Sequence, residues 1–520
     1  MALTPFELEI FQNILSSIAE EMGMLLIRAG FSPNIKERRD LSCAIFNSKG
    51  DMIAQAAHIP IHLGSMGFAV KAVLDEPDMQ PGDVYILNDP FRGGTHLPDV
   101  TCIKPIFSEG RIVFFVASRA HHADMGGITP GSMPISTTVE EEGVLISPSK
   151  LYIKNRLNKK LFNKILNSTR DPEEREGDFN AQSGALDLGE KRLTETISKY
   201  SLNTLVEAGE ELLNYSEKMM KEVIKAIPDG VYSFQDVMDD DGAGTLKIPI
   251  KVKITIKGSR AEVDFSGSSP PVKGNLNAPY SVTTAAAIYV FQCLAPKELP
   301  LNSGPLRVVK IRVDDHSILN AKFPSAVVGG NVETSQRVVD VVFGALSKAI
   351  PEKIPAASAG SMSNITFGGI NPRTGRTYAY YETIAGGMGG RPGKEGVSAV
   401  QTHMTNTLNT PIEALERELP VMINAYTIRR RSGGGGKFKG GDAIKREFKF
   451  LTKTTVSLIT ERRKFSPYSL RGGEDGTRGK NKLIAKGKVT GLPPKCTFEV
   501  KKGDIISIET PGGGGWGRRK

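Results

Sequence analysis

The spacing of apolar residues along the chain changes with position and predicts both helices and strands. Apolar residues recur at helical intervals from Phe11 to Leu25. Thr4, Pro5 and Glu7 precede this pattern. Because Thr4 and Glu7 have the spacing of a capping box and proline suits a first helical turn, the helix is expected to begin there. Residues 151–167 also have a helical pattern, residues 171–182 resemble a polar connection, and residues 192–227 predict one long amphipathic helix.

Short β-rich segments separated by turn residues predict strands. Residues 33–55 have the pattern of a hairpin with its turn at residues 47–50. Residues 84–87, 112–117, 246–256, 261–265 and 306–313 predict further strands. The apolar stretch 282–294 is expected to be a buried helix, and residues 329–340 predict a glycine turn that leads into a helix ending near Ala349.

These elements together predict an α+β fold with multi-layer mixed sheets, packed helices and a β-rich second half. A soft boundary near Gly230 separates an N-terminal domain, residues 1–230, from a C-terminal domain, residues 231–520. Glycine runs near residues 386–393, 432–436 and 512–516 lie between strand-like segments. Since those segments are rich in Phe, Val and Ile, close-packed turns are favoured over flexible linkers.

Composition narrows the protein class without naming it. The 520 residues include 39% hydrophobic and 24% charged residues, which is ordinary for a soluble globular protein. The net charge of +10 comes from basic residues that do not interleave with aromatics, so we expect no nucleic-acid partner. Four separated cysteines fit a reducing cytosol. Glu7 and Glu9 argue against a signal peptide, and residues 282–295 are too few to span a bilayer, so a cytoplasmic protein with no membrane partner is expected.

A cluster of histidines and carboxylates lies between Asn88 and Gly127. His96 and Asp99 flank Pro98, which disfavours a helix and indicates a turn at a strand end. His121 and His122 follow the strand 112–117 and would face opposite sides if the strand continues. At most one of them is therefore expected to join His96 and Asp99, and we favour His121.

Several neighbouring residues remain open in their roles. Glu37 and Asp40 could reach the site or pair with Arg38 and Arg39, and pairing is favoured. Pro60 separates two further histidines, His58 and His62, and argues against a helical metal pair, so we expect these histidines to line a pocket rather than to bind an ion. Two histidines and one or two carboxylates would suit Zn, Mn or Fe. A metal-free acid–base site is equally compatible with these residue types.

The stretches that carry this chemistry resemble the hydantoinase B/oxoprolinase family. The similarity covers nearly the whole chain and rests on the following runs: Glu37-Arg-Arg-Asp-Leu-Ser, His58-Ile-Pro-Ile-His-Leu-Gly-Ser-Met, residues 88–99, Ala120-His-His-Ala-Asp-Met-Gly-Gly, Gly330-Asn-Val-Glu-Thr-Ser-Gln-Arg, Thr405-Asn-Thr-Leu-Asn-Thr-Pro-Ile-Glu and Glu461-Arg-Arg. The resemblance implies a metal site at His96, Asp99 and His121, with Glu37 as a less secure fourth ligand.

The resemblance also implies a partner and a reaction. In this family a hydantoinase A-type ATPase subunit binds ATP and phosphorylates the substrate, which fits the lack of a phosphate-loop motif in this chain. The chain is then expected to be the B subunit of a hetero-oligomeric N-methylhydantoinase or 5-oxoprolinase, which opens a small cyclic amide with water. As hypotheses, His122 or Asp124 would act as general base, and Arg119 would hold the phosphorylated oxygen. The alternative is a subunit of an acetone or acetophenone carboxylase, a ligase.

Overall fold

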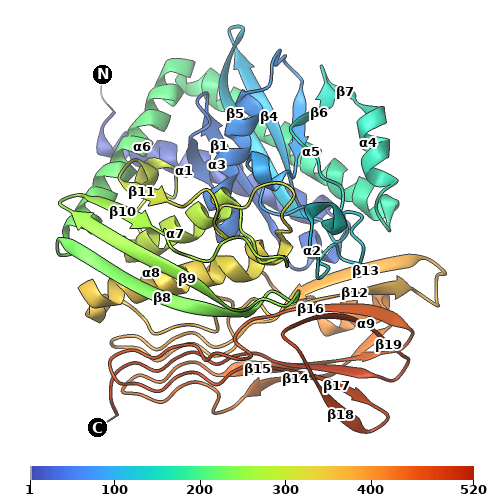
Figure 1. The fold of residues 1–520 in the computed structure, drawn as a ribbon. Helices are drawn as coiled ribbons and strands as arrows, with labels where there is room; N and C mark the ends of the chain where they lie inside the picture. The colour runs from blue at the N-terminus through green and yellow to red at the C-terminus, as the bar shows by residue number, and fades with distance from the viewer. Residues whose placement is uncertain (1–2, 520) are drawn as a thin grey trace.

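The computed structural model describes residues 3–519 and confirms the α+β class (Figure 1). Its first layer is a seven-stranded sheet in the order β2-β1-β5-β4-β3-β6-β7. These strands are β1 (Leu41–Asn47), β2 (Met52–Gln55), β3 (Val84–Leu87), β4 (Asp99–Ser108), β5 (Arg111–His121), β6 (Ser149–Ile153) and β7 (Arg156–Leu157). The predicted hairpin at 33–55 and the strands at 84–87 and 112–117 are thereby confirmed.

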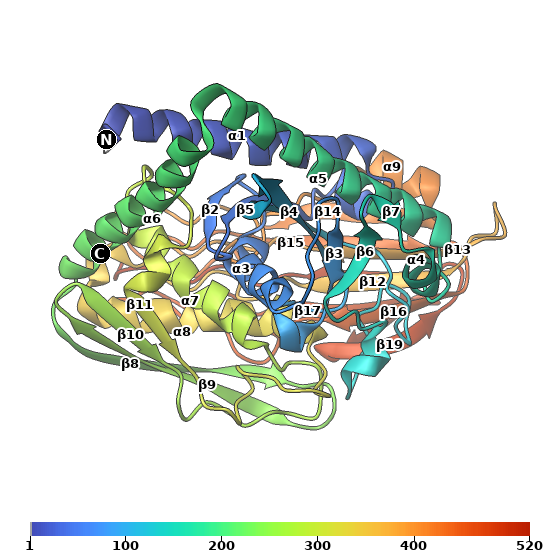
Figure 2. The same ribbon diagram turned by 90° about the horizontal axis from the view of Figure 1, so that it is seen from above.

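Helices cover both faces of this first sheet, which explains why its central strands are continuously apolar. Cys43, Val100 and Val116 pack on one face against α1 (Pro5–Ala29), α5 (Pro172–Tyr200) and α6 (Leu202–Lys225). Figure 2 shows α1 and α5 crossing this side of the sheet. Ala44 and Phe115 point to the other face, where α3 (Pro60–Leu74) lies. Alternate residues of one strand therefore reach two different environments.

Helix α1 begins as predicted, with the side chain of Thr4 and Glu7 forming a capping box. It is the one helix of the described chain long and apolar enough to cross a membrane. Its buried residues, among them Leu15, Met22 and Leu26, pack into the core beside α5 and the first sheet. This packing is that of a core helix in a soluble-type α+β fold.

A second layer consists of the four-stranded sheet β11-β10-β9-β8 with two buried helices. Its strands are β8 (Gly230–Asp240), β9 (Leu246–Lys257), β10 (Arg260–Asp264) and β11 (Val309–Arg312), and its helices are α7 (Tyr280–Leu294) and α8 (Ser335–Ala349). These bounds confirm the predicted buried helix and the helix that follows Gly329. One hydrophobic cluster joins this layer to Ile59, Ile61 and Met220, so elements on both sides of residue 230 share a core.

Two further sheets form the C-terminal part of the fold, coloured orange to red in Figure 1. One has the order β13-β12-β16-β19 and the other β14-β15-β20-β17-β18, and they enclose a common core. Their strands are β12 (Asn364–Ile370), β13 (Thr377–Thr383), β14 (Val421–Arg429), β15 (Ala443–Phe450), β16 (Thr454–Ile459), β17 (Lys480–Ala485), β18 (Lys488–Leu492), β19 (Lys495–Val500) and β20 (Ile505–Glu509), with α9 (Ile412–Glu418) beside them.

The glycine runs pack tightly, as predicted, but as extended segments rather than turns. Gly390 donates its N–H to the Gly514 carbonyl, and Gly513 donates to the Gly441 carbonyl, at 2.8 and 3.0 Å. A Cβ atom at Gly387 would lie 1.9 Å from the Gly441 carbonyl oxygen. The backbones therefore lie too close for any side chain there.

Four expectations about local structure were wrong. Residues 171–182 are the first part of α5, and the predicted helix 192–227 is divided because Ser201 adopts a φ of 73° between α5 and α6. Residues 151–167 contain β6 and β7 before α4 (Lys159–Leu166) begins. The predicted strand 306–313 is shorter, because its first residues form a 3-10 turn that ends at Arg307. Pro60 begins α3 instead of preventing a helix, because the first helical turn needs no proline N–H.

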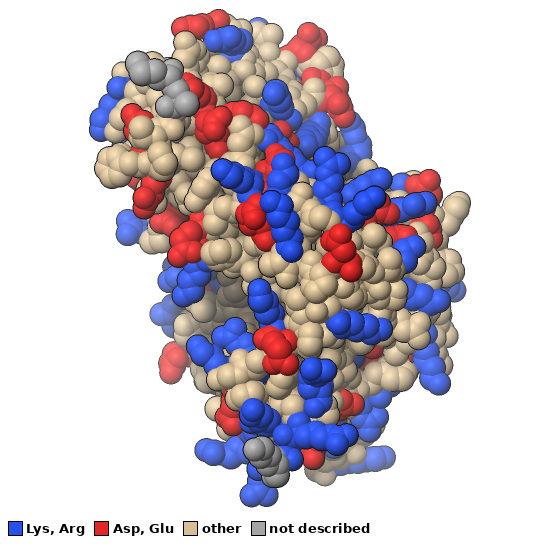
Figure 3. Space-filling model, turned by 90° about the vertical axis from the view of Figure 1, so that its left-hand side faces the viewer, with Lys and Arg blue, Asp and Glu red and all other residues tan. Residues whose placement is uncertain are grey.

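Charged side chains on the face in Figure 3 are of both signs. Lys and Arg alternate with Asp and Glu over its upper part and become more frequent toward the lower part. The positive net charge of the chain is therefore unevenly distributed on this face.

Candidate metal centre

Two strand ends place Asp99 beside His121. Asp99 begins β4 and His121 ends β5, and the two residues are direct partners in the antiparallel pairing of these strands. His121 Nδ1 lies 3.1 Å from Asp99 Oδ1. Both side chains point to the α3 side of the first sheet, and both are buried. The strand register thus brings together two residues that lie 22 positions apart.

A turn before β4 adds His96 to this pair. His96 Nε2 lies 3.0 Å from Asp99 Oδ1, and the rings of His96 and His121 are 5.1 Å apart between centroids. One ligand atom from each of the three residues lies within 4.8 Å of the others. We call His96, Asp99 and His121 the triad.

The other carboxylate oxygen of Asp99 is also surrounded by polar groups. It accepts hydrogen bonds from Thr95 Oγ1 at 2.7 Å and from Asn331 Nδ2 at 3.3 Å, and His62 Nε2 lies 3.3 Å away. His62 is in the first turn of α3, and its Nε2 is also 3.8 Å from Asp40 Oδ1. Each oxygen of Asp99 therefore faces at least two polar neighbours.

An aromatic residue from the C-terminal sheets closes the site. Tyr381 of β13 stacks on His121, with ring centroids 4.4 Å apart and an interplanar angle of 21°. Its hydroxyl donates to Asn364 Oδ1 at 2.9 Å, and Asn364 Nδ2 donates to Glu333 Oε1 at 2.7 Å. Residues from the first sheet and from a C-terminal sheet therefore share one centre.

Burial and neighbouring charges determine the protonation preferences at the triad. Burial would raise the pKa of Asp99, but the surrounding imidazoles, which act as cations or hydrogen-bond donors, hold it well below 3.8. Burial lowers the pKa of His121, which favours the neutral imidazole. An ionised carboxylate beside neutral imidazoles is the donor set that binds divalent metals.

Unsatisfied polar atoms test whether a metal would fit. Both ring nitrogens of His96, Nε2 of His121 and Oδ1 of Asn331 are buried without hydrogen-bond partners among the described residues. Buried polar atoms normally have partners, and leaving them unpaired costs free energy. A divalent ion between His96, Asp99 and His121 would satisfy the imidazole nitrogens, so the residues present fit such a group.

The structure does not bring His122 or Asp124 to the triad. His122 lies on the opposite face of the sheet, where its ring stacks on Phe179 and its Nε2 is 2.9 Å from Gln182 Oε1. Burial lowers the pKa of His122 to about 4. Asp124 Oδ2 accepts hydrogen bonds from Arg170 at 2.7 Å and from the N–H of Gly131 at 3.0 Å. These contacts favour structural support over proton transfer to a substrate.

Arg119 and Glu37 also differ from their predicted surroundings. The Arg119 guanidinium is buried and donates to Thr101 Oγ1 at 2.7 Å and to Ser65 Oγ at 2.6 Å, which fixes the start of α3. Glu37 is partly exposed, its side chain has no hydrogen bond or ion pair with another described residue, and it is outside the group of potential ligands. Asp40 is the nearer carboxylate, and it also makes the expected pair with Arg38, at 3.7 Å.

Sequence reasoning did not identify several residues of this centre. His62 was expected only to line a pocket, because Pro60 was taken to exclude a helix. Asn331 and Tyr381 lie more than 200 residues from Asp99, and only the tertiary fold brings them there. Asn331 does fall in one of the runs that carry the family resemblance, and this was the available signal.

Comparisons with known proteins identify the class. The sequence model of the Hydantoinase B/oxoprolinase family matches residues 4–519, so the chain belongs to this family. The chain is 44% identical to an uncharacterized protein of Methanocaldococcus jannaschii, over 98% of this chain and 90% of that protein. It is 40% identical to the 5-oxoprolinase of Dictyostelium discoideum, over 99% of this chain but only 40% of the relative.

Solved structures agree with this assignment. The ATP-dependent caprolactamase of Pseudomonas jessenii superposes with a TM-score of 0.93 at 26% identity, over all of this chain and 92% of that one. The nucleotide-free acetone carboxylase superposes with a TM-score of 0.92, over 99% of this chain and 76% of that one. At 19% identity, the second likeness shows the fold alone.

Proposed function

We propose that this chain is the ring-opening component of an ATP-dependent cyclic-amide hydrolase that acts on 5-oxoproline or a hydantoin. The observation that carries the proposal is the buried triad of His96, Asp99 and His121 in a chain 40% identical to a 5-oxoprolinase. Caprolactam, in the name of the structural neighbour, is also a cyclic amide. A shared substrate class therefore agrees with a shared fold.

In this proposal the triad holds a divalent metal, Zn, Mn or Fe. The bound ion would polarise the substrate oxygen or lower the pKa of a water molecule. Asp99 would bind in ionised form, His121 as neutral imidazole, and Tyr381 would fix the orientation of the His121 ring. Asp40, rather than the predicted Glu37, is the carboxylate whose position suits a fourth ligand, since it lies 3.8 Å from His62 beside Asp99.

ATP would be bound by a partner subunit of the hydantoinase A type in a hetero-oligomer located in the cytoplasm. The support is the length relation: the chain spans 40% of the Dictyostelium 5-oxoprolinase but 92% of a caprolactamase chain. The remainder of the longer protein would then correspond to a separate chain here. Activation elsewhere would leave this chain the hydrolytic step, in which water adds to the activated carbonyl carbon and the ring C–N bond breaks.

The predicted roles of His122, Asp124 and Arg119 stay predictions, but their contacts lead us to propose supporting roles. Arg119 would position α3, which carries His62, and Asp124 would hold the loop after β5 through Arg170. His62 is the better candidate for proton transfer, because it touches Asp99 from the α3 side and its ring is not the partner of another sheet residue.

The test is co-expression with an A-type ATPase subunit and measurement of product. ATP-dependent release of glutamate from 5-oxoproline, or of a carbamoyl amino acid from a hydantoin, is expected from the wild-type pair and not from His96→Ala. Consumption of acetone that requires both ATP and bicarbonate, without ring opening of either cyclic amide, would overturn the proposal in favour of a carboxylase. His122→Ala serves as a matched control, since it removes an adjacent buried imidazole outside the triad.

A further inference from the structure

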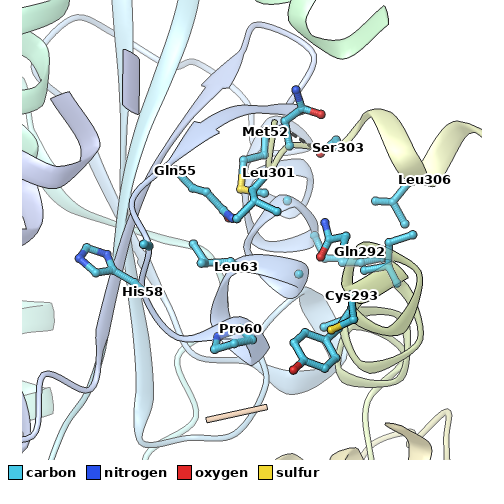
Figure 4. A pocket seen from close by; sticks show the side chains of 18 of the residues that line it. Met52, Gln55, His58, Pro60, Leu63, Gln292, Cys293, Leu301, Ser303 and Leu306 are labelled. Atoms are coloured by element: carbon cyan, nitrogen blue, oxygen red, sulfur yellow. Dashed lines mark hydrogen bonds between the residues drawn. The ribbon is translucent and has the colours of Figure 1, made fainter. Parts of the chain in front are cut away.

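A separate cavity of about 340 Å³ lies between the β1–β2 hairpin, α3 and α7 (Figure 4). None of the three triad residues lines it. Its walls come from β2, from α3, from α7 and from residues 301–306. A cavity of this size is within the range of small-molecule sites. It is therefore a candidate binding site in its own right.

The walls of this cavity are mainly apolar and carry little charge. Met52, Leu63, Ile288, Leu301 and Leu306 supply hydrocarbon surface. His58 borders the cavity in neutral form, because burial lowers its pKa to about 4. The charged lining residue is Lys71, which is half exposed and pairs with Asp51 at 3.1 Å. An ion would lose its hydration here without gaining a buried counter-charge.

Two amide side chains supply the unused hydrogen-bonding capacity. Gln55 reaches the cavity from β2 and Gln292 from α7, and Figure 4 shows their amide groups directed toward the space between them. Neither side chain has a hydrogen-bond partner among the described residues, and Gln55 Oε1 is also buried. By contrast, Ser303 Oγ already accepts the N–H of Met52 at 2.9 Å. Unpaired buried amides are costly unless a ligand satisfies them.

We infer that this cavity binds an uncharged small molecule that has an apolar body and one amide or carbonyl group. The apolar walls would cover the body, and the Gln55 and Gln292 amides would donate to and accept from its polar group. The site lies close to the triad, because the turn of α3 that presents Leu63 also carries His62, 3.3 Å from Asp99. It is nevertheless distinct from the triad and does not depend on the proposed reaction.

Benzamide is the probe, with benzoate and toluene as matched compounds that alter or remove the amide. Calorimetric titration of the full chain is expected to show one saturable benzamide site. Benzoate should bind at least about tenfold more weakly, because its charge must be desolvated. Equal binding of benzoate, or no saturable binding of benzamide, would overturn the inference.

Two substitutions locate the site. A Cβ at Gly67 would meet only the Gly50 carbonyl oxygen, at 3.7 Å, so Gly67→Leu can fill the cavity without a backbone clash and should abolish benzamide binding. Gln292→Met keeps the side-chain length but removes the amide, and should weaken benzamide about tenfold while leaving toluene unchanged. Since Gln292→Met removes no buried bond, it keeps the test decisive if Gly67→Leu does not fold. Benzamide affinity unchanged by Gln292→Met would contradict the inference.

Discussion

Replacing Asp99 by asparagine should weaken the fold and also remove its stabilisation by metal. Asn has the shape of Asp but carries no charge, and one of its two terminal groups donates instead of accepting. In the wild-type chain both Asp99 oxygens accept or face donors, including Thr95, Asn331 and the triad histidines. At least one of these donors must therefore face an NH₂ group in Asp99→Asn.

The size of the effect follows from these contacts. A hydrogen bond to a charged group contributes about 1.5–3 kcal/mol, and breaking a buried charged pair costs about 3–5 kcal/mol. Asp99 is buried with relative exposure of 0%, so solvent does not screen these interactions. We expect the metal-free Asp99→Asn chain to be less stable than the metal-free wild type by about 2–4 kcal/mol.

The assay compares unfolding midpoints with chelator and with added Mn²⁺ or Zn²⁺. A ligand present at about 1,000 times its dissociation constant stabilises the native state by about 4 kcal/mol. The wild type should gain this stabilisation and Asp99→Asn should not. Asp124→Asn is the control: it removes another buried carboxylate, paired with Arg170, and should lose baseline stability but keep the gain from metal.

The comparison of the two variants decides the outcome. An equal gain from metal in Asp99→Asn and the wild type would refute the assignment of Asp99 as a ligand. Loss of the gain in Asp124→Asn as well would show that metal stabilisation depends on the fold in general.

Three further predictions concern groups around the triad and in the C-terminal sheets. Burial raises the pKa of Glu142 from 4.5 to about 8, so its contribution to stability is complete below pH 4.5 and is lost as the pH rises through 8; Glu142→Gln should remove that loss, at most about 5 kcal/mol, in urea unfolding at pH 5 to 9. Gly387→Ala should destabilise the chain by at least about 2 kcal/mol, because its Cβ would lie 1.9 Å from a carbonyl oxygen, whereas Gly491→Ala, which has open space, should change the unfolding midpoint little. Tyr381→Phe keeps the ring on His121 but leaves Asn364 Oδ1 without its donor, so stability should fall by about 1–2 kcal/mol with metal content unchanged, and loss of metal would show that the hydroxyl has a direct role.

Local sequence patterns predicted the elements whose signals are short-range. The capping box at Thr4 and Glu7, the hairpin around residues 47–50 and the buried helix at 282–294 each depend on neighbouring residues, and each is confirmed. Proline at position 60 was misinterpreted, because the same residue that ends a helix can also begin one. The break at Ser201 was missed because its positive φ is imposed by the packing of α5 and α6 and not by glycine.

The same distinction applies to the candidate site. Alternation along β5 correctly predicted that His121 and His122 face opposite sides, which is why His121 joins Asp99 and His122 meets Gln182. The surroundings of Asp99 could not be predicted, since Asn331 and Tyr381 arrive from distant elements. Asp124 and Arg119 have the residue types of catalytic groups, but their partners Arg170 and Ser65 are apparent only from the fold.

The metal content of purified variants tests the central claim most directly. Elemental analysis of the wild type and of His122→Ala should find the same bound divalent metal, because His122 lies on the other face of the sheet. His96→Ala and His121→Ala should each lose that metal while remaining folded by circular dichroism. Unchanged metal content in both of these variants would contradict the triad as a metal site, and with it the account of this chain as the metal-dependent ring-opening component.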